Sequence, residues 1–496
     1  MNRIVYSVLL LLFSIIAGRS QNPVVAEVQM ANSFTISDVI VKAQSQSPIF
    51  KQTETRLQNS YWQYRYYRSN YSPQIRAMSN QGALYTNSIT PIRQPDGSIV
   101  YLPVNQINPG VNFSLQQPIA LTNTTISVNS SYNYFKDIIT QGTQWNGAPM
   151  YVQVDQQLLS YNRLKWDKKI QPIRYEESKR DYAESMEQIS SDAVNYFFSV
   201  MDAQINLQIA RYNLANNDTI YKIEKGRYNM GTTSEDKLLQ VELQLLRSRQ
   251  DVGNANLQLQ TTSLDLRNYL GIRNGEGFKL ELPEEIPLLT VLEEDALDYA
   301  KRTRSAYVAF ERRKLEAEAQ VAQTKGQLYQ VGVTAAFGLN NTGRTISDLY
   351  QNPSRQQIAN ITFNVPIVDW GRRRAQLQTA YANKKLNDYI IAQDEVQFDQ
   401  QILTKVRQFE MLYLQVEITK KSDEVALKRY NVAQNRYLIG KIDITNLNIA
   451  LTEKDNAKRG YVNALRNFWT AYYDLRRLTL YDFAENKFLY NPGQEG

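Results

Sequence analysis

Few side chains in this chain are suited to catalysis, because the sequence contains no cysteine and no histidine. The absence of cysteine excludes disulfides, thiol nucleophiles and zinc–thiolate sites, and the absence of histidine removes the commonest general base and transition-metal ligand. The remaining chemistry is that of paired carboxylates, as in glycoside hydrolysis. The acidic runs are Glu284–Glu285 and Glu293–Asp295. Solvation or compensation of a helix dipole explains both runs, so the sequence predicts no enzyme, no metal site and no cofactor.

The composition excludes further classes of protein. The 496 residues are 43% hydrophobic and 21% charged, which is too polar for a bundle of apolar membrane helices. The formal net charge of +7 is mild and forms no polybasic run, so we expect no nucleic-acid partner. Glycine and proline number only 21 and 15, which argues against a fibrous or disordered chain.

The first twenty residues are typical of a secretory signal peptide. Arg3 precedes an apolar run from Ile4 to Ala17, and small residues follow it. The run is shorter than the ~20 residues that a spanning helix needs. We predict that residues 1–20 form a signal peptide cleaved after Ser20, and that the protein leaves the cytoplasm.

The remaining chain reads as two copies of one unit. RYNMG at Arg227–Gly231 recurs as RYLIG at Arg436–Gly440, an offset of 209 residues, whereas Ala43 pairs with Ala300 at an offset of 257. The first copy therefore holds 48 extra residues, which we assign to the Pro-, Asn- and Ser-rich segment of about 87–148. The predicted units are residues 21–290 and 291–480, joined by a linker near Gly271–Thr290 and followed by a loop-like tail, 481–496.

Each copy contains very long helices. Apolar and small residues recur in steps of three and four over residues 189–214, 238–269, 402–416 and 447–478, a spacing that imposes supercoiled pairing of helices. Only Pro172 interrupts the pattern from Arg163 to Tyr228, which predicts a rod of about 100 Å. Such rods exceed the needs of an ordinary domain.

Each long helix is predicted to turn back at a tip. The tips are Asn229–Leu238 and Leu438–Leu447, and Gly231 and Gly440 suit the left-handed position that ends a helix. Thr233 or Ser234 can cap the next helix in the first copy, and Asp443 in the second.

Strands are predicted between the helices. Apolar side chains alternate with small or polar ones over residues 152–158, 331–339 and 361–367. Such segments suit strands of an outer-membrane barrel, and the alternative is the edge of a soluble sandwich. Val111–Gln117 and Thr125–Phe135 are also strand-like, and we expect them to form an extracellular hairpin. If they cross the bilayer, each protomer supplies six strands.

Aromatic residues mark the expected junctions between strands and helices. Tyrosines crowd residues 61–71 around Trp62, and Trp166 and Trp370 follow the return strands of the two copies. We predict that the three tryptophans belong to a membrane-interface belt. The alternative is that the Tyr-rich helices simply pack through tyrosine.

Four motifs in order resemble one family, the TolC-like outer-membrane efflux proteins, in a version found in Bacteroidetes. They are TISDVIVKAQSQSP (Thr35–Pro48), MGTTSEDKLLQVE (Met230–Glu242), NVPIVDWGRRR (Asn364–Arg374) and YLIGKIDITNLNIA (Tyr437–Ala450). The insertion and the Lys165–Lys169 stretch resemble the Bacteroidetes version. The resemblance covers nearly the whole mature chain.

The resemblance implies a mainly α fold with a transmembrane β-barrel. Long coiled hairpins of a homotrimer would form a periplasmic α-barrel, and each protomer would give four strands to a shared twelve-stranded barrel in the outer-membrane lipid. The tips would dock a periplasmic adaptor protein that couples the channel to an inner-membrane pump, for efflux or type I secretion. The implied adaptor contacts are Met230, Gly231, Thr232, Thr233, Ile439, Gly440, Lys441 and Ile442.

The implied aperture departs from the family pattern. Tyr437 occupies the place of an aromatic of the closed gate, and Tyr228, Lys237, Asn446 and Ile449 complete the aperture set. Some members carry acidic rings where this chain has Asn446 and Ile449, so no acidic ring is expected.

The strand-to-helix turns also differ between the copies. The usual glycine is kept at Gly371 and replaced by Asn162 in the first copy. We expect Asn162 to keep the left-handed turn, because Asn tolerates that conformation best after Gly. A secreted helical scaffold or adhesin without a pore remains the alternative to an export conduit, and the duplicated strands favour the conduit.

Overall fold

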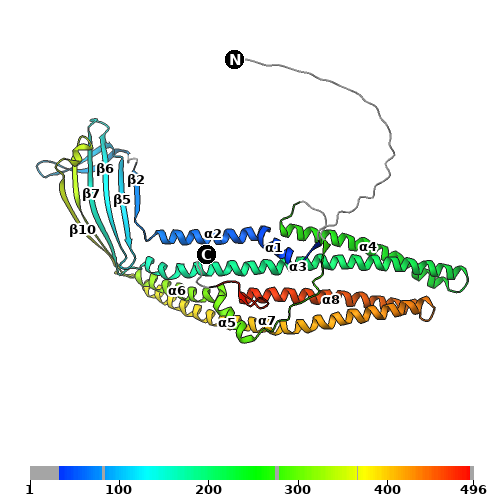
Figure 1. Cartoon of the computed structure of the whole chain (residues 1–496). Coiled ribbons are helices and arrows are strands. Elements are labelled where there is room, and N and C mark those ends of the chain that lie inside the picture. Colours follow the sequence, from blue (N-terminus) through cyan, green and yellow to red (C-terminus); the bar gives the residue numbers. More distant parts are fainter. Residues whose placement is uncertain (1–32, 81–83, 274–278, 366, 492–496) are drawn as a thin grey trace, which may run out of the picture.

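A sheet stands at one end of the molecule, and a set of long helices runs away from it to two separate tips (Figure 1). The computed structural model describes residues 33–80, 84–273, 279–365 and 367–491. The predicted signal peptide, residues 1–20, lies outside these residues. The predicted fold class, long helical hairpins joined to a sheet, is confirmed.

The helices repeat with the offsets found in the sequence. The long helices α3 (Arg163–Asn229) and α7 (Arg372–Leu438) each have 67 residues, and their partners α4 (Glu235–Leu270) and α8 (Ile444–Thr479) each have 36. Each pair is offset by 209 residues. Four shorter helices repeat with an offset of 257: α1 (Ile36–Gln46), α2 (Pro48–Ser69), α5 (Glu293–Thr303) and α6 (Ser305–Gly326).

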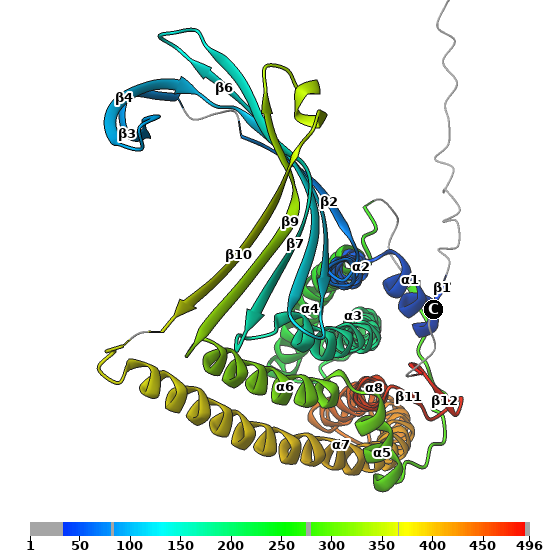
Figure 2. The ribbon, with the colours of Figure 1, turned by 90° about the vertical axis from the view of Figure 1, so that its left-hand side faces the viewer.

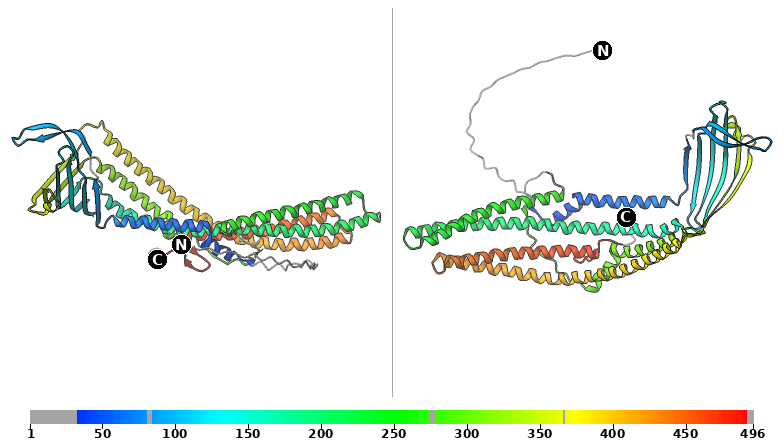
Figure 3. Two further views of the ribbon diagram at one scale, coloured as in Figure 1. Left: turned by 90° about the horizontal axis from the view of Figure 1, so that it is seen from above. Right: turned by 180° about the vertical axis from the view of Figure 1, so that it is seen from behind.

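The shorter helices complete two continuous rods (Figure 1). α4 lies along the half of α3 that leads to the tip, and α2 lies along the half that leads to the sheet; α8 and α6 flank α7 in the same way (Figure 3). The heptad positions form the buried seam, where Phe197, Leu266 and Phe468 are fully buried. The helical part of the duplication is therefore confirmed.

The sheet contains eight strands that pair antiparallel. Six of them run side by side in the order β2-β5-β6-β7-β9-β10, and a hairpin of β3 and β4 joins the outer end of β6 (Figure 2). Their bounds are β2 Gln74–Asn80, β3 Leu84–Arg93, β4 Ile99–Ile107, β5 Gly110–Ile119, β6 Thr124–Asp137, β7 Thr143–Leu158, β9 Gln330–Gly343 and β10 Ser354–Asn364. The minor strands are β1 (Ser33–Phe34), β8 (Lys279–Leu280), β11 (Tyr481–Asp482) and β12 (Lys487–Phe488).

The sheet differs from the expectation of four strands per protomer. The runs Val111–Gln117 and Thr125–Phe135 are strands, as predicted, but they lie in β5 and β6 within the sheet rather than in a hairpin that projects from it. The reason is their register, because β6 pairs with β7 from Thr124 to Lys136 and with β5 from Thr124 to Asn133. This corrects the assignment of these two runs to an extracellular hairpin.

The C-terminal tail is tied to the helices. β11 and β12 form a short hairpin, and Arg476 of α8 lies 2.9 Å from Asp482 of β11 and 2.9 Å from Glu187 of α3. Tyr472 Oη donates to Asp482 Oδ1 at 2.8 Å. The described part of the predicted loop-like tail therefore has a defined docking site between the two copies.

Candidate channel wall and helical tips

The main sheet has one apolar and one polar face. Side chains in the same register rows alternate between the faces from β2 to β10. The apolar face carries Ile75, Ala77, Val111, Phe113, Leu115, Ile126, Val128, Val152, Val154, Val333, Ala335, Phe337, Ile361 and Phe363. The polar face carries Arg76, Asn112, Ser114, Gln116, Ser127, Asn129, Gln153, Asp155, Thr334, Asn360 and Thr362.

The apolar face is uncovered within one copy of the chain. Ile75, Phe337 and Phe363 are 82%, 59% and 69% exposed. An apolar surface of this extent marks a site of contact with lipid or another protein. Alternation of an outward apolar face with an inward polar one is the pattern of a membrane barrel.

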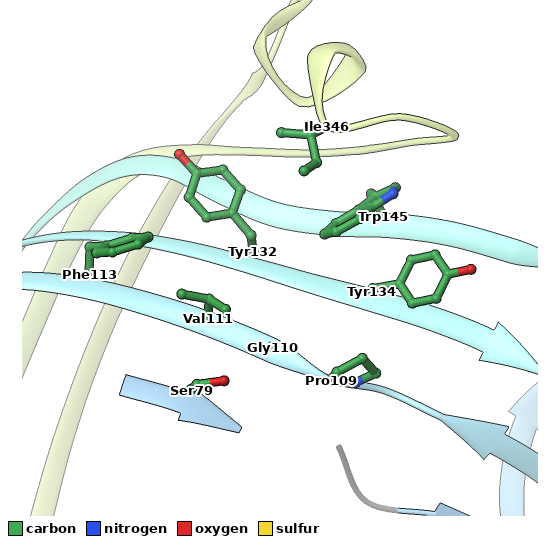
Figure 4. Close-up of a pocket in the computed structure, with 9 residues that line it drawn as sticks. All are labelled: Ser79, Pro109, Gly110, Val111, Phe113, Tyr132, Tyr134, Trp145 and Ile346. Atoms are coloured by element: carbon green, nitrogen blue, oxygen red, sulfur yellow. The ribbon is translucent and has the colours of Figure 1, made fainter. Parts of the chain in front are cut away.

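Aromatic side chains gather at the outer end of the apolar face (Figure 4). Phe113, Tyr132, Tyr134 and Trp145 line a hollow of about 710 Å³, and the Tyr134 and Trp145 ring centroids are 5.0 Å apart. The sequence analysis missed this cluster, although the alternation of Tyr132 and Tyr134 in β6 is a visible signal. From Trp145 to Leu158, β7 extends about 40 Å, or about 30 Å across a bilayer at a tilt of about 40°.

The predicted interface tryptophans lie on the helical side of the sheet. Trp166 is half-buried in the first turn of α3, with Lys169 Nζ 5.1 Å from its ring centroid. Trp370 directly precedes α7 and is 96% exposed. Trp62 is exposed on α2, seven residues before that helix ends, so it lies farther from the sheet than the other two.

The two strand-to-helix turns use different chemistry. Gly371 has φ +80° and is left-handed, as predicted. Asn162 has φ −90° and ψ 92°, which corrects the expectation of a left-handed turn there. Its side chain instead accepts from Lys165 N at 3.0 Å and donates to Ala120 O at 2.6 Å. Asn162 is therefore an N-cap that also fastens the β5–β6 turn to α3.

The two helical tips have the same backbone geometry. Gly231 and Gly440 have φ of +72° and +74°. Thr232 N donates to Arg227 O at 2.9 Å, and Lys441 N donates to Arg436 O at 2.8 Å. These are Schellman endings, which require the left-handed residue that glycine supplies. Asp443 caps α8 through Asn446 N at 2.9 Å, while Ser234 at the start of α4 makes no side-chain cap bond.

The predicted adaptor contacts are largely exposed at these tips. Met230 and Ile439 occupy equivalent positions in the two copies and are 72% and 66% exposed. Thr232 and Lys441 are also exposed, and Thr233 is half-buried. Ile442 packs partly against the small core near the tips. Each tip therefore presents one large apolar side chain to solvent.

A family model for outer membrane efflux proteins matches residues 123–272 and 297–479, about two thirds of the chain. The chain belongs to the outer membrane efflux protein family. It is an outer-membrane channel protein with a periplasmic helical part. The first matched segment begins at the turn before β6, and the second covers α5 to α8.

Solved structures similar to this efflux protein share its fold at low identity. They include the CmeC outer membrane channel of Campylobacter jejuni, with a TM-score of 0.64, 15% identity and coverage of 91% of this chain and 87% of that chain. VceC from Vibrio cholerae has a TM-score of 0.62, 14% identity and coverage of 90% and 95%. The MtrE channel of Neisseria gonorrhoeae, in its open state, has a TM-score of 0.60, 14% identity and coverage of 90% and 88%. Among curated proteins, none matches the sequence.

A buried polar network joins the two hairpins of the efflux protein near the tips. Tyr437 is 3% exposed, and its hydroxyl donates to Glu224 Oε1 at 2.7 Å. Arg227 Nη1 donates to the same oxygen at 2.6 Å. Burial raises the pKa of the Glu224 carboxyl, but the hydrogen bonds from Tyr437 and Arg227 outweigh it and hold that pKa below its ordinary value. Burial and the bond to Glu224 raise the pKa of the Tyr437 phenol.

The other predicted aperture residues lie outside this network. Tyr228, Lys237, Asn446 and Ile449 are exposed. Asn446 Nδ2 donates to Asp443 Oδ1 at 2.9 Å, within the cap of α8. Sequence reasoning missed Glu224, because its role depends on which helix faces it.

A second network joins the hairpins farther from the tips. Lys454 Nζ is 4.5 Å and 4.6 Å from the ring centroids of Tyr212 and Tyr430, and 3.2 Å from Asp455 Oδ1. Asn213 Nδ2 donates to Asp455 Oδ2 at 2.7 Å. The hairpins α3–α4 and α7–α8 are therefore connected at two levels.

Two searches of the described residues found no other kind of site. No helix among them is long and apolar enough to span a bilayer. In the same part of the chain, acidic side chains form no group of three that is placed to hold a metal ion. Glu293, from the acidic run considered for catalysis, forms an ion pair with Arg407 at 2.7 Å.

Proposed function

We propose that this efflux protein is a homotrimeric, passive export conduit of a tripartite efflux or type I secretion system. The observation that carries the proposal is a curved sheet with an exposed apolar face, a polar face and two unpaired edges. A sheet in a bilayer must pair every edge, so one copy cannot complete the wall. Cargo would pass along the polar face and continue between the helical rods, without any catalytic step.

We place the membrane-interface belts at the two ends of the sheet. The outer belt contains Tyr132, Tyr134 and Trp145, and the inner belt contains Trp166 and Trp370. Aromatic side chains favour both interfaces of a bilayer, because their rings are amphipathic. Trp62 lies beyond the inner belt, where it can contact headgroups only if the bilayer reaches α2.

The tips are the proposed docking site for the periplasmic adaptor, which would connect the channel to an inner-membrane pump. Met230 and Ile439 offer equivalent apolar anchors, and Lys441 adds a positive charge to one of the two tips. Thr232, Thr233 and Ile442 would form the surrounding contacts. Alternating tips with similar geometry suit an adaptor that contacts both repeats.

The network of Glu224, Arg227 and Tyr437 is the proposed lock of the aperture. It fixes α7 against α3 next to both tips, so outward movement of one hairpin must break it. Opening would then be a sliding of packed helices. Tyr228, Lys237, Asn446 and Ile449 would line or border the aperture.

The conduit is tested by fractionation and electrical recording. We expect a heat-modifiable trimer in the outer-membrane fraction that forms conducting pores in planar lipid films. A monomer that stays soluble without detergent and gives no conductance would instead establish the secreted scaffold.

Adaptor docking is tested at the tip glycines. Gly231→Val places a β-branched residue at φ +72° and should abolish export, measured as growth of a complemented deletion strain on a dye and bile-salt panel, while trimers persist. Lys441→Glu should weaken export in the same assay. Gly97→Val, at φ +88° in the β3–β4 loop, is the matched strain control and should export normally. Normal export by both tip variants would remove the docking assignment.

A further inference from the structure

The duplication locates the extra residues of the first copy. β9 and β10 have counterparts 209 residues earlier in β6 and β7, and α5 and α6 have counterparts 257 residues earlier in α1 and α2. The offset therefore changes between the end of α2 at Ser69 and the start of β6 at Thr124. The insertion consists of β2, β3, β4 and β5, rather than the predicted segment of about 87–148.

Two inserted strands cover an edge that the second copy leaves free. β6 is the counterpart of β9, so without the insertion its outer side would end the sheet. In this chain β5 pairs with that side of β6 over ten residue pairs, from Gly110↔Asn133 to Ile119↔Thr124. β2 then pairs with β5 over seven residue pairs. The sheet consequently ends at β2 and not at β6.

The inserted strands continue both faces of the sheet without a break. Leu115 of β5 lies in one register row with Val128, Val152 and Phe337, all on the apolar face. Gln116 lies in the next row with Ser127, Gln153 and Ala336, on the other face. Ile75 of β2 extends the apolar row beyond Leu115. β2 and β5 are thus patterned as wall strands with one side for lipid.

We propose that β2 of one copy pairs with β10 of the next, so that three copies close a barrel of eighteen strands instead of twelve. This inference rests on the proposed trimeric conduit. Strand directions alternate across the six strands, so β2 and β10 run in opposite directions and can pair antiparallel as a closed barrel requires. Barrel diameter grows roughly linearly with strand number, so the outer lumen is about one and a half times wider.

Cysteine accessibility tests whether β5 belongs to the wall, because the native chain has no cysteine. Leu115→Cys and Gln116→Cys probe β5, and Phe337→Cys and Ala336→Cys are the controls in the same two register rows of β9. In intact outer membranes we expect a charged maleimide to label Gln116→Cys and Ala336→Cys at least tenfold faster than their apolar-face neighbours.

The outcomes separate this inference from the proposed function. If Leu115→Cys labels as fast as Gln116→Cys while the β9 pair still differs, β5 lies outside the wall and the eighteen-stranded barrel is refuted, but the conduit stands. If the β9 pair also shows no difference, the sheet is not a membrane wall and both proposals fail.

Crosslinking between copies tests the new edge directly. Ala77→Cys in β2 is combined in turn with Gln357→Cys, Ala359→Cys or Ile361→Cys in β10, all on the same face. We expect oxidation of at least one pair to give covalent trimers. Val128→Cys in β6 replaces Ala77→Cys as the matched control and should give none. Trimers formed only with Val128→Cys would show that β6 is the edge and overturn the inference.

Discussion

The two copies of the duplicated unit are identical in helix length and different in strand number. α3 and α7, and likewise α4 and α8, match residue for residue in length, whereas the first copy contributes four strands to the main sheet and the second contributes two. The helices must reach the same level at their tips and pack along one another, so a change in one copy would shift every contact of the seam. A sheet accepts extra strands in pairs, because an even number preserves the direction of the chain.

The copies also differ in how their equivalent polar residues are used. Arg476 is buried between two carboxylates, and its counterpart is Arg267; Tyr437 is buried in the hairpin network, and its counterpart Tyr228 is exposed. The second copy therefore supplies the buried polar contacts that hold the hairpins together. Equivalent substitutions in the two copies test this asymmetry.

The largest effect is expected for Arg476→Ala. The substitution leaves Glu187 and Asp482 buried without their cation, and breaking a buried ion pair on one side costs about 3 to 5 kcal/mol. We expect a clear fall in the temperature of the helical melting transition, followed by circular dichroism of the detergent-solubilised trimer. Arg267→Ala is the matched control and should shift it little. Equal shifts would show that the two copies contribute alike.

A smaller effect is expected for Tyr437→Phe, which removes the hydrogen bond to Glu224. Such a bond to a charged acceptor contributes about 1.5 to 3 kcal/mol. If the network locks the aperture, the variant should conduct more in planar lipid films and sensitise cells to bulky antibiotics. Tyr228→Phe should change neither property, because that ring is exposed at the equivalent place. Unchanged conductance in Tyr437→Phe would remove the lock assignment.

The same lock predicts a dependence on pH. The pKa of Glu224 is lowered in the folded protein, so its stabilising effect is complete above the ordinary value of 4.5 and is lost as the pH falls through the lowered pKa. Conductance should therefore rise in acid below about pH 4.5. Glu224→Gln should remove that rise and conduct at neutral pH as the native protein does in acid. A rise that persists in Glu224→Gln would assign the effect to other carboxyl groups.

The sequence was sufficient for elements whose pattern is local. Heptad spacing and the left-handed glycines predicted α3, α7 and both tips, because a helix is specified by neighbours three and four residues apart. The place of β5 was not predictable in this way, because alternation shows that a segment is a strand and not which strand it pairs with. Glu224 was missed for the same reason, since its partner Tyr437 is 213 residues away. Gly371 and Asn162 show an intermediate case, in which the turn was found and its geometry was not.

The smallest effect is expected at these two turns, where the copies solve one problem differently. Asn162→Ala removes the N-cap of α3 and the bond to Ala120 O, and loss of such a cap costs about 1 kcal/mol. Asn162→Gly should cost only a few tenths of a kcal/mol by comparison. At Gly371, where φ is +80°, alanine introduces left-handed strain, and asparagine should be tolerated better. Melting of the four trimeric variants should thus rank glycine above alanine at position 162, and asparagine above alanine at position 371. If Asn162→Gly proved as damaging as Asn162→Ala, the bond to the β5–β6 turn would outweigh the cap, and the inserted strands would depend on Asn162 for their attachment to α3.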